Sequence, residues 1–310
     1  MKILLTSTSF QDTPGKHHDG LNETGLIIDT LRGPVKEDAL LPIIAKYDGV
    51  ICGDDHYTRK VIEKGKAGKL KVISKYGIGL DKIDLKAALE FEIKVTNCPG
   101  VNHMAVAEHI WALILAFYKN IPDEINYTRY GKWERLIGHE IYGKKIGVAG
   151  LGRIGKEVLI RAKAFGLKLY AFDKYIDTEF VKEHSIKICN TLEKLFSTTD
   201  IISLNMNLNK ENKKCITKEI LDNHTKRGLL LINSARGELV DEKAIVYGIK
   251  NKILDGYLTD VLNEEPMQKG HPFLDYNNII ITPHIGSRTY ESVERQGLMA
   301  VKNLVKSLLI

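Results

Sequence analysis

Cysteine is scarce in this sequence, with four among 310 residues: Cys52, Cys98, Cys189 and Cys215. They are widely separated, form no Cys-x-x-Cys pair and have no histidine at the spacing of a zinc ligand. Disulfide frameworks and cysteine-based metal sites need closely patterned pairs. We therefore expect reduced structural thiols and no bound metal.

No uninterrupted apolar run reaches the length of a membrane span, which needs about 20 residues. The opening Met1–Thr6 is too short for the core of a signal peptide, and Glu108 and His109 interrupt the apolar segment 102–118. These features predict a cytoplasmic protein with no membrane contact.

A dense basic run is also missing, although the formal net charge is +6. The lysines are scattered through amphipathic segments, which is typical of a solvated surface and not of a nucleic-acid-binding arm. The resulting field favours small anionic substrates. No internal repeat or low-complexity linker is evident, so a chain of this length is expected to form two domains that meet directly at a cleft.

Two series of alternating strands and helices are predicted. The first comprises Lys2–Thr6, Val35–Lys46, Gly49–Ile51, Thr58–Ala67, Lys71–Ser74, Leu85–Leu89 and Lys94–Thr96. A long apolar helix follows from about Asn102 to Tyr118. The second series has six strands, at Ile146–Ala149, Leu167–Phe172, Ile201–Leu204, Leu229–Asn233, Gly256–Thr259 and Ile279–Thr282. Six strands of this kind suit a doubly wound parallel sheet.

The last segment, after Gly286, has the apolar spacing of an amphipathic helix and needs a surface to cover its stripe. We expect it to return to the first domain. The fold class is thus α/β, with a Rossmann-type doubly wound parallel sheet domain (100–285) inserted into a smaller flavodoxin-like α/β domain (1–99 and 286–310).

A glycine-spaced turn follows the strand at Ile146–Ala149, with Gly150, Gly152 and Gly155 at Gly-x-Gly-x-x-Gly spacing. Such a turn lets the backbone and the start of the next helix, here Arg153 and Ile154, approach a dinucleotide pyrophosphate. Asp173 ends the next strand, 23 residues after Gly150. A carboxylate there accepts from ribose hydroxyls and favours NAD over NADP. The domain that contains both motifs, 100–285, would therefore bind NAD, and the discontinuous domain would bind substrate. The alternative interpretation is a purely structural turn.

Three charged residues follow the ends of later strands: Arg236, Glu265 and His284. The carboxyl ends of strands form the ligand edge of an open α/β sheet. There Arg236 would hold a substrate carboxylate, His284 would exchange a proton, and Glu265 would favour protonated His284. Taken singly, each is also explained as a surface charge, a turn residue or a satisfied polar group.

Together these motifs, over nearly the whole chain, resemble the D-isomer-specific 2-hydroxyacid dehydrogenase family, most closely its phosphoglycerate-dehydrogenase-like members. The resemblance implies Arg236 as substrate binder, Glu265 as the partner of the histidine and His284 as the acid/base. It also implies that Asp260 contacts the nicotinamide carboxamide and that the backbone at Ala235 lies along the cofactor.

The resemblance extends to a glycine loop whose amides would receive the substrate carboxylate: Lys75, Tyr76, Gly77, Ile78 and Gly79. A simple turn is the alternative, and Lys75 would either meet a substrate phosphate or be solvated. Asn102 would face the cleft or cap the following helix. The segment 100–145, which includes Trp133, is implied as a homodimer interface, with a Trp buried within one chain as the alternative.

One segment departs from the family pattern. Asn205, Asn207 and Asn209 occupy a loop where relatives typically have His and Pro. Because this loop usually lines the cofactor, the departure bears on its contacts and on its rigidity.

The leading hypothesis is NAD-dependent interconversion of a small D-2-hydroxy acid and its 2-keto acid. The first hypothesis for the substrate is 3-phosphoglycerate, which would place the chain in serine biosynthesis. The second hypothesis is the reduction of glyoxylate or hydroxypyruvate. A non-catalytic NADH-sensing protein, like the corepressors that share this fold, and formate or phosphite oxidation stay open. Because the sequence ends at Ile310, feedback control through the additional regulatory domain of some phosphoglycerate dehydrogenases is not expected.

Overall fold

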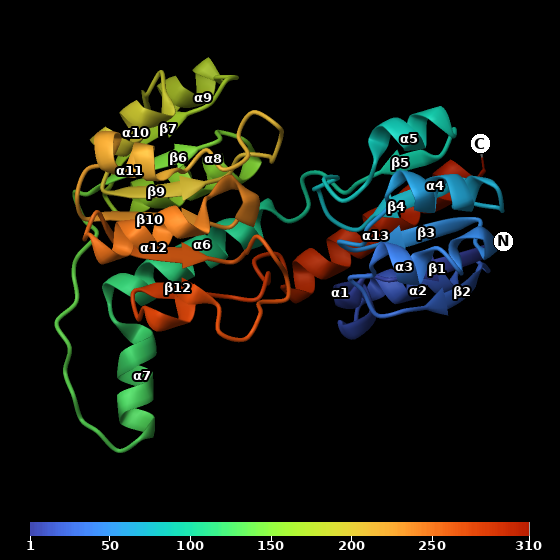
Figure 1. The fold of residues 1–310 in the computed structure, drawn as a ribbon, viewed down its shortest axis with the longest axis horizontal. Coiled ribbons are helices and arrows are strands. Elements are labelled where there is room, and N and C mark those ends of the chain that lie inside the picture. Colours follow the sequence, from blue (N-terminus) through green and yellow to red (C-terminus); the bar gives the residue numbers. More distant parts are fainter. Residues whose placement is uncertain (310) are drawn as a thin grey trace. The chain divides into compact units, whose positions relative to one another are not determined.

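The computed structural model describes residues 1–309, which fall into two compact units (Figure 1). Unit 1 comprises Met1–Asn102 and the chain from Ser287 onward, and unit 2 comprises His103–Gly286. The predicted division after residues 99 and 285 lies about three residues and one residue from these boundaries. The chain therefore passes from one unit to the other twice.

Unit 1 is built on a five-stranded parallel sheet in the order β2-β1-β3-β4-β5, the flavodoxin-like order. Its strands are β1 (Lys2–Leu5), β2 (Ile27–Thr30), β3 (Gly49–Cys52), β4 (Val72–Lys75) and β5 (Lys94–Thr96). Its helices are α1 (Thr8–Asp12), α2 (Lys16–Asn22), α3 (Glu37–Leu40), η1 (Ile44–Lys46), α4 (Arg59–Lys66), α5 (Leu85–Glu90) and α13 (Tyr290–Leu308).

Three elements of unit 1, namely α1, α2 and β2, were not predicted from the sequence. The strand β2 lies at the edge of the sheet and contains no fully buried residue, so it lacks the continuous apolar pattern of a central strand. The two helices are short and follow no clear apolar periodicity. The predicted helix Val35–Lys46 is divided into α3 and η1.

The C-terminal helix α13 packs on the sheet of unit 1 and makes this unit discontinuous. Its apolar stripe, with Ala300, Val301 and Leu304, shares a buried cluster with Ile3 and Val72 of the sheet. The hydroxyl of Ser74 also donates to the carbonyl oxygen of Ala300, at 2.8 Å. The amphipathic pattern after Gly286 therefore covers the first domain, as expected.

Unit 2 is built on a seven-stranded parallel sheet in the order β12-β11-β10-β9-β6-β7-β8. The strands are β6 (Lys145–Ala149), β7 (Lys168–Phe172), β8 (Lys187–Ile188), β9 (Ile201–Leu204), β10 (Leu229–Asn233), β11 (Leu254–Thr259) and β12 (Ile279–Ile281). The six predicted strands are confirmed, and the two-residue edge strand β8 is added. Strand order reverses between β6 and β9, the place where such sheets bind dinucleotides.

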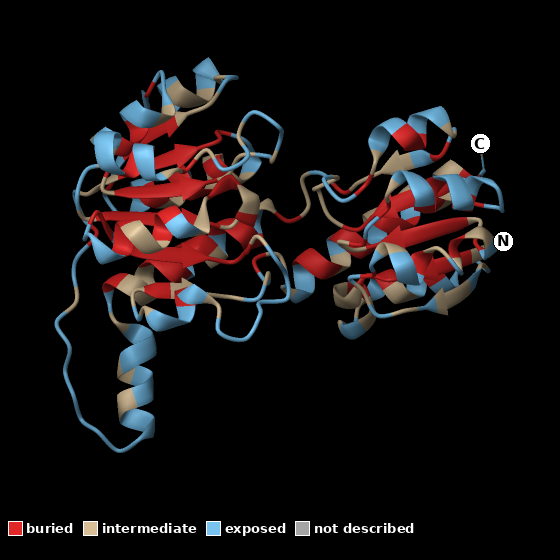
Figure 2. Ribbon diagram, in the orientation of Figure 1, coloured by how far each residue is buried: buried red, intermediate tan, exposed pale blue. Residues whose placement is uncertain are grey.

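Helices cover both faces of this sheet, so its central strands β6, β9 and β10 are buried on both sides (Figure 2). One face packs against α6 (His103–Tyr118) and α8 (Arg153–Ala164), and the other packs against α10 (Leu192–Thr198), α11 (Lys218–His224) and α12 (Glu242–Lys250). The predicted apolar helix 102–118 is thus α6. Two further α-helices, α7 (Ile121–Arg129) and α9 (Thr178–Glu183), and two short 3-10 helices, η2 (Gly237–Leu239) and η3 (Pro272–Asp275), complete the unit.

Among residues 1–309, no helix is long and apolar enough to cross a membrane, and no group of three metal-binding side chains is found. Cys52, Cys98 and Cys189 are buried, Cys215 is half-buried, and all four are free thiols.

Candidate active site

The glycine turn after β6 brings backbone segments into close contact. Gly150 has a φ of +102°, and a Cβ there would meet the backbone of Asn205, which follows β9, at 2.7 Å. A Cβ at Gly155 would lie 2.1 Å from the carbonyl oxygen of Gly150. Glycine is therefore required at both positions to seat α8 against the strand.

Gly152 differs from these two because a Cβ there would meet nothing within 4 Å. It precedes Arg153 and Ile154 at the start of α8, a helix of 12 residues whose N-terminus receives no side-chain hydrogen bond from its cap. The buried hydroxyl of Ser234, after β10, has no hydrogen-bond partner among residues 1–309. Open space, unused backbone donors and an unpaired hydroxyl fit a dinucleotide at this edge of the sheet.

Asp173 lies directly beside the glycine turn. One carboxylate oxygen accepts from the amide of Leu151 at 2.6 Å, and the other accepts from the amide of Tyr175 at 2.9 Å. The residue is half-buried at the end of β7. Its carboxylate is fixed next to the turn, at the position where the sequence predicts a ribose contact.

The asparagine-rich loop after β9 is held by its own side chains. The carboxamide oxygen of Asn209 accepts from the amides of Glu211 and Asn212, at 2.8 and 3.0 Å, and that of Asn212 accepts from the amide of Asn209 at 2.7 Å. The Asn205 amide group donates to the Ser203 carbonyl oxygen at 3.1 Å. Side-chain-to-backbone hydrogen bonds thus organise this loop, which contains no proline.

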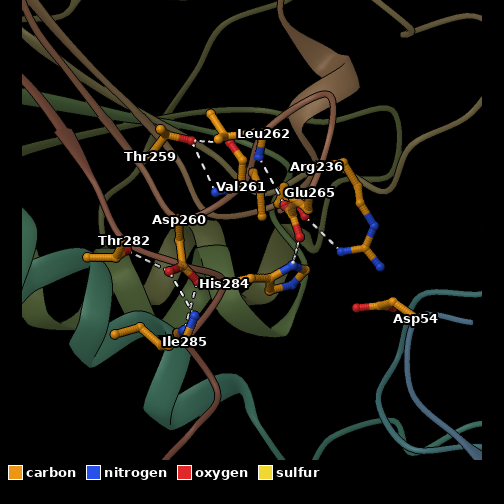
Figure 3. A network of polar contacts seen from close by, with 12 residues as sticks. Asp54, Arg236, Thr259, Asp260, Val261, Leu262, Glu265, Thr282, His284 and Ile285 are labelled. Atoms are coloured by element: carbon orange, nitrogen blue, oxygen red, sulfur yellow. Dashed lines mark hydrogen bonds and ion pairs between the residues drawn. The ribbon is translucent and has the colours of Figure 1, made fainter. Parts of the chain in front are cut away.

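His284 and Glu265 are brought together across 19 residues, as the sequence predicts (Figure 3). Nδ1 of the imidazole lies 2.8 Å from Oε2 of Glu265, and each side chain is about one third exposed. The second oxygen of Glu265 accepts from the amide of Leu262 at 3.0 Å. Because an ionised carboxylate only accepts hydrogen bonds, Nδ1 carries a hydrogen and Nε2 is the nitrogen that can exchange a proton.

Arg236 extends from the loop after β10 at the same edge of the sheet (Figure 3). Its Nη1 donates to the carbonyl oxygen of Ala235 at 2.8 Å, and the amide of Ala235 donates to Asn233 at 3.1 Å. The residue is half-buried.

Asp260 follows β11 and is 2% exposed. Its Oδ1 accepts from the hydroxyl of Thr282 at 2.6 Å and from the amide of Ile285 at 2.9 Å, and its Oδ2 accepts from the amide of Gly286 at 2.7 Å (Figure 3). Burial opposes ionisation, but hydrogen bonds from His109, Thr282, Ile285 and Gly286 lower the pKa of Asp260. The carboxylate predicted to contact the nicotinamide is therefore engaged with the histidine loop.

The backbone of His284 is left-handed, with a φ of +54°. Its amide donates to the carbonyl oxygen of Asp260 at 2.9 Å, and the next two amides donate to the Asp260 carboxylate. A non-glycine residue in this conformation is strained by about 1–2 kcal/mol. Asp260 therefore holds His284 in an unfavourable backbone conformation.

The substrate residues predicted in unit 1 lie at and after the end of β4. Gly77 has a φ of +121°, and the carbonyl oxygen of Ile78 accepts from Asn97 at 2.8 Å. Tyr76 is 8% exposed and its hydroxyl lacks a partner among residues 1–309, while Gly79 is half-buried. The roles of these residues stay predictions.

Lys75 is buried and not solvated, which corrects that alternative. It is 4% exposed, and its Nζ lies 2.5 Å from the carbonyl oxygen of Gly53 and 2.5 Å from the Asp54 carboxylate. Asn102 is buried, and its Oδ1 accepts no hydrogen bond within residues 1–309. It therefore does not cap α6 through that oxygen.

His109 was not singled out as a functional residue by the sequence, where it only interrupted an apolar helix. In the structure its Nε2 lies 3.0 Å from the hydroxyl of Thr282 and 3.4 Å from Oδ1 of Asp260. A histidine within an apolar helix is the single sequence signal that marks it.

Residues 111–286 match the family model described as "D-isomer specific 2-hydroxyacid dehydrogenase, NAD binding domain". A glyoxylate reductase from Korarchaeum cryptofilum is 34% identical over 245 residues, covering 77% of this chain and 73% of the relative. The chain belongs to the D-isomer-specific 2-hydroxyacid dehydrogenase family. Unit 2 accordingly contains the NAD-binding domain of that family.

Other similar proteins have different substrates or none in their names. A D-3-phosphoglycerate dehydrogenase from Methanocaldococcus jannaschii is 36% identical over 310 residues, covering 99% of this chain. The chain spans 57% of the length of that relative. The solved TT0316 protein from Thermus thermophilus is 35% identical, with a TM-score of 0.89 over 100% of this chain and 97% of that protein.

Replacing Asp260 with Asn is expected to lower the free energy of unfolding at pH 7 by about 1–3 kcal/mol, because an NH2 group would face a loop donor. The lowered pKa of Asp260 means that its ionised form stabilises the fold above its ordinary pKa of 3.8, and that this contribution is lost as the pH falls below 3.8. Urea unfolding of both proteins from pH 7 to pH 3 measures the difference.

The matched control is Asp255→Asn, at an exposed position on β11, the strand that precedes Asp260. This variant should leave the free energy of unfolding within about 0.5 kcal/mol of wild type. A difference between wild type and Asp260→Asn that is equally large at pH 3 and pH 7 would contradict the assignment.

Proposed function

We propose that this chain is an NAD-dependent oxidoreductase that interconverts a small D-2-hydroxy acid and its 2-keto acid. The observation that carries the proposal is the His284–Glu265 pair, with Nδ1 2.8 Å from Oε2, at the same edge of the sheet as the glycine turn. A proton-transfer group there lies at the edge where a parallel sheet binds a dinucleotide.

Each residue of the pair has a distinct part in keto-acid reduction. When bound, NADH supplies the hydride. Nε2 of His284 donates a proton to the oxygen of the substrate carbonyl, and in the reverse direction it accepts that proton. Glu265 keeps the imidazole oriented through Nδ1, and its negative charge offsets the positive charge of the protonated ring.

Arg236 is proposed to bind the substrate carboxylate and to polarise the neighbouring carbonyl. A guanidinium presents parallel N–H donors that match a carboxylate in two hydrogen bonds. Asp173, beside the glycine turn through its bond to Leu151, is proposed to accept from the ribose hydroxyls. Its charge opposes the additional phosphate of NADP, so we propose NAD as the preferred cofactor.

For the substrate, the pairing of Lys75 favours an unphosphorylated acid over 3-phosphoglycerate. Lys75 was the basic residue to which the resemblance assigned a phosphate contact, and its charge is compensated by Asp54 at 2.5 Å. A second carboxylate, Asp55, follows directly and is buried. Negative charge beside Lys75 repels a phosphate dianion and so disfavours binding of a phosphorylated substrate there. We therefore propose glyoxylate or hydroxypyruvate as the keto acid.

With NADH, kcat/KM for hydroxypyruvate or glyoxylate is expected to exceed that for phosphohydroxypyruvate about ten-fold or more, equivalent to about 1.4 kcal/mol. Asp54→Asn should lower the ratio of kcat/KM for the unphosphorylated acid to kcat/KM for phosphohydroxypyruvate, because the charge of Lys75 is then less compensated. Initial rates at 340 nm across these acids and pyruvate, with NADH and then NADPH, test both points. A preference for phosphohydroxypyruvate would instead support 3-phosphoglycerate as the substrate.

Replacing His284 with Gln is expected to lower kcat about 10²–10⁴-fold, because the amide cannot exchange the proton. NADH binding, followed by nucleotide fluorescence, should stay within about three-fold of wild type. Wild-type turnover by this variant would refute the role of His284. If the wild-type protein binds NADH but turns over none of the acids, the proposed oxidoreductase activity is wrong and the NADH-sensing alternative gains support.

We also propose a homodimer formed through the 100–145 region. The helix α7 has no buried residue, and the segment after it is exposed (Figure 2). Its apolar side chains include Trp133 at 84%, Ile137 at 93% and Tyr142 at 78% exposure. Trp133 is thus not buried within its own chain. Large apolar side chains gathered on one projecting segment are typical of an interaction surface.

The wild-type protein is expected to sediment as a dimer at micromolar concentration, and Ile137→Asp should shift it toward the monomer by placing a charge in the interface. The control is Leu89→Asp, at a residue that is 82% exposed in unit 1, and this variant should leave the dimer intact. Sedimentation velocity measures both. A monomeric wild-type protein, or equal dissociation by both variants, would rule out this interface.

A further inference from the structure

His109 joins the helix α6 to the loop that carries His284. Its side chain is 16% exposed. Nε2 lies 3.0 Å from the hydroxyl oxygen of Thr282 and 3.4 Å from Oδ1 of Asp260. Thr282 is 173 residues away in the sequence, so the fold, and not local chain geometry, brings these groups together.

Counting hydrogens fixes the direction of these bonds. The Thr282 hydroxyl has one hydrogen, and at 2.6 Å it donates that hydrogen to the ionised Asp260 carboxylate. The hydroxyl oxygen is then only an acceptor toward His109. Nε2 of His109 therefore carries a hydrogen and donates to Thr282, with Oδ1 of Asp260 as a second, longer acceptor.

The same carboxylate sets the conformation of the histidine loop. Oδ1 also accepts from the amide of Ile285 and Oδ2 accepts from the amide of Gly286. These residues follow His284, whose left-handed backbone needs support from its neighbours. The chain of donors thus runs from His109 through Thr282 and Asp260 to the backbone that aims the His284 imidazole.

Close packing leaves this loop little freedom beside His109. A Cβ at Gly286 would lie 2.9 Å from Oδ2 of Asp260 and 3.5 Å from Cδ2 of His109. The imidazole edge therefore lies beside the loop at Gly286, in addition to its hydrogen bond to Thr282. An apolar side chain would fill similar space on α6, so the specific contribution of a histidine here is the Nε2–H donor.

We propose that His109 is a positioning residue for proton transfer, acting on His284 through Thr282 and Asp260. This inference rests on the proposed function, in which His284 exchanges the proton. His109 itself does not touch the substrate in this scheme. Its donor orients the Asp260 carboxylate, and the carboxylate fixes the angle at which His284 meets the substrate carbonyl.

Two amide variants separate this role from simple packing. A glutamine at position 109 places its NH2 group near the position of Nε2, whereas an asparagine places it near Nδ1. His109→Gln is expected to keep kcat within about three-fold of wild type. His109→Asn should lower kcat about 10- to 100-fold, the size of effect expected for a displaced catalytic group. KM for the keto acid and the affinity for NADH should change less than about three-fold in both.

Thr282 supplies a second, near-isosteric pair. Thr282→Val removes the hydroxyl and should lower kcat to a similar extent as His109→Asn, whereas Thr282→Ser keeps the hydroxyl and should retain turnover. Because both changes interrupt one chain of donors, the double variant His109→Asn/Thr282→Val should be no worse than about three-fold below the poorer single variant. Fully multiplicative losses would show two independent effects and overturn the proposal.

A measurement that needs no turnover keeps the failure of this inference distinct from failure of the proposed function. NMR titration of ring-labelled histidine, with the His284 signals assigned through His284→Gln, reports the environment of the imidazole directly. His109→Asn should move those signals or their titration midpoint, and His109→Gln should not. If the wild-type protein reduces no keto acid but the His284 signals still differ between His109→Asn and His109→Gln, the positioning inference holds and the proposed activity is wrong.

The opposite pattern overturns the inference. Unchanged His284 signals in all four single variants, or equal losses of kcat in His109→Gln and His109→Asn with an unshifted pH profile, would assign His109 to packing alone. Thermal unfolding of each variant identifies losses that arise from unfolded protein, and the Thr282 pair carries the test if the position 109 variants do not fold.

Discussion

Parallel pairing of every strand in unit 2 is the constraint from which the candidate site follows. Since all seven strands run in one direction, the segments that leave their carboxyl ends gather at one edge of the sheet. The glycine turn, Arg236, Asp260 and the His284 loop all leave strands at this edge. Their chemistry is brought together by strand direction, although their positions in the sequence are far apart.

Within that edge, the buried charge of Asp260 organises the loop after β12. A carboxylate removed from water is stable only when hydrogen-bond donors surround it. The loop supplies the donors from its own backbone at Ile285 and Gly286 and from the side chain of Thr282. The need to solvate one charge thus determines the conformation of the segment that presents His284, and α6 contributes a further donor.

Much of this arrangement could be predicted from the sequence because it depends on local patterns. The continuous apolar runs of buried strands and the spacing of Gly150, Gly152 and Gly155 identified the unit 2 sheet and its turn. The edge strands β2 and β8 contain no buried residue and were missed. The pairing of Glu265 with His284 followed from their strand-end positions.

Contacts between side chains from distant segments were beyond such reasoning. Nothing near Lys75 indicates that Asp54 compensates its charge, and nothing near His109 indicates a bond to Thr282. In the sequence, the asparagines after β9 were interpreted as a departure from the family pattern. In the structure, they form a hydrogen-bonded loop. Each outcome depends on which atoms the completed fold places within about 3 Å of one another.

The left-handed backbone at His284 has a consequence for how this position has been selected. Glycine would adopt that conformation without strain, so folding alone favours glycine and chemistry alone favours histidine. A screen that selected variants only for resistance to heat would accept glycine at 284 and discard the imidazole. With the proposed role of His284 in proton transfer, the residue at this position records a stability–activity trade-off, in which a less stable loop is retained for the sake of the imidazole.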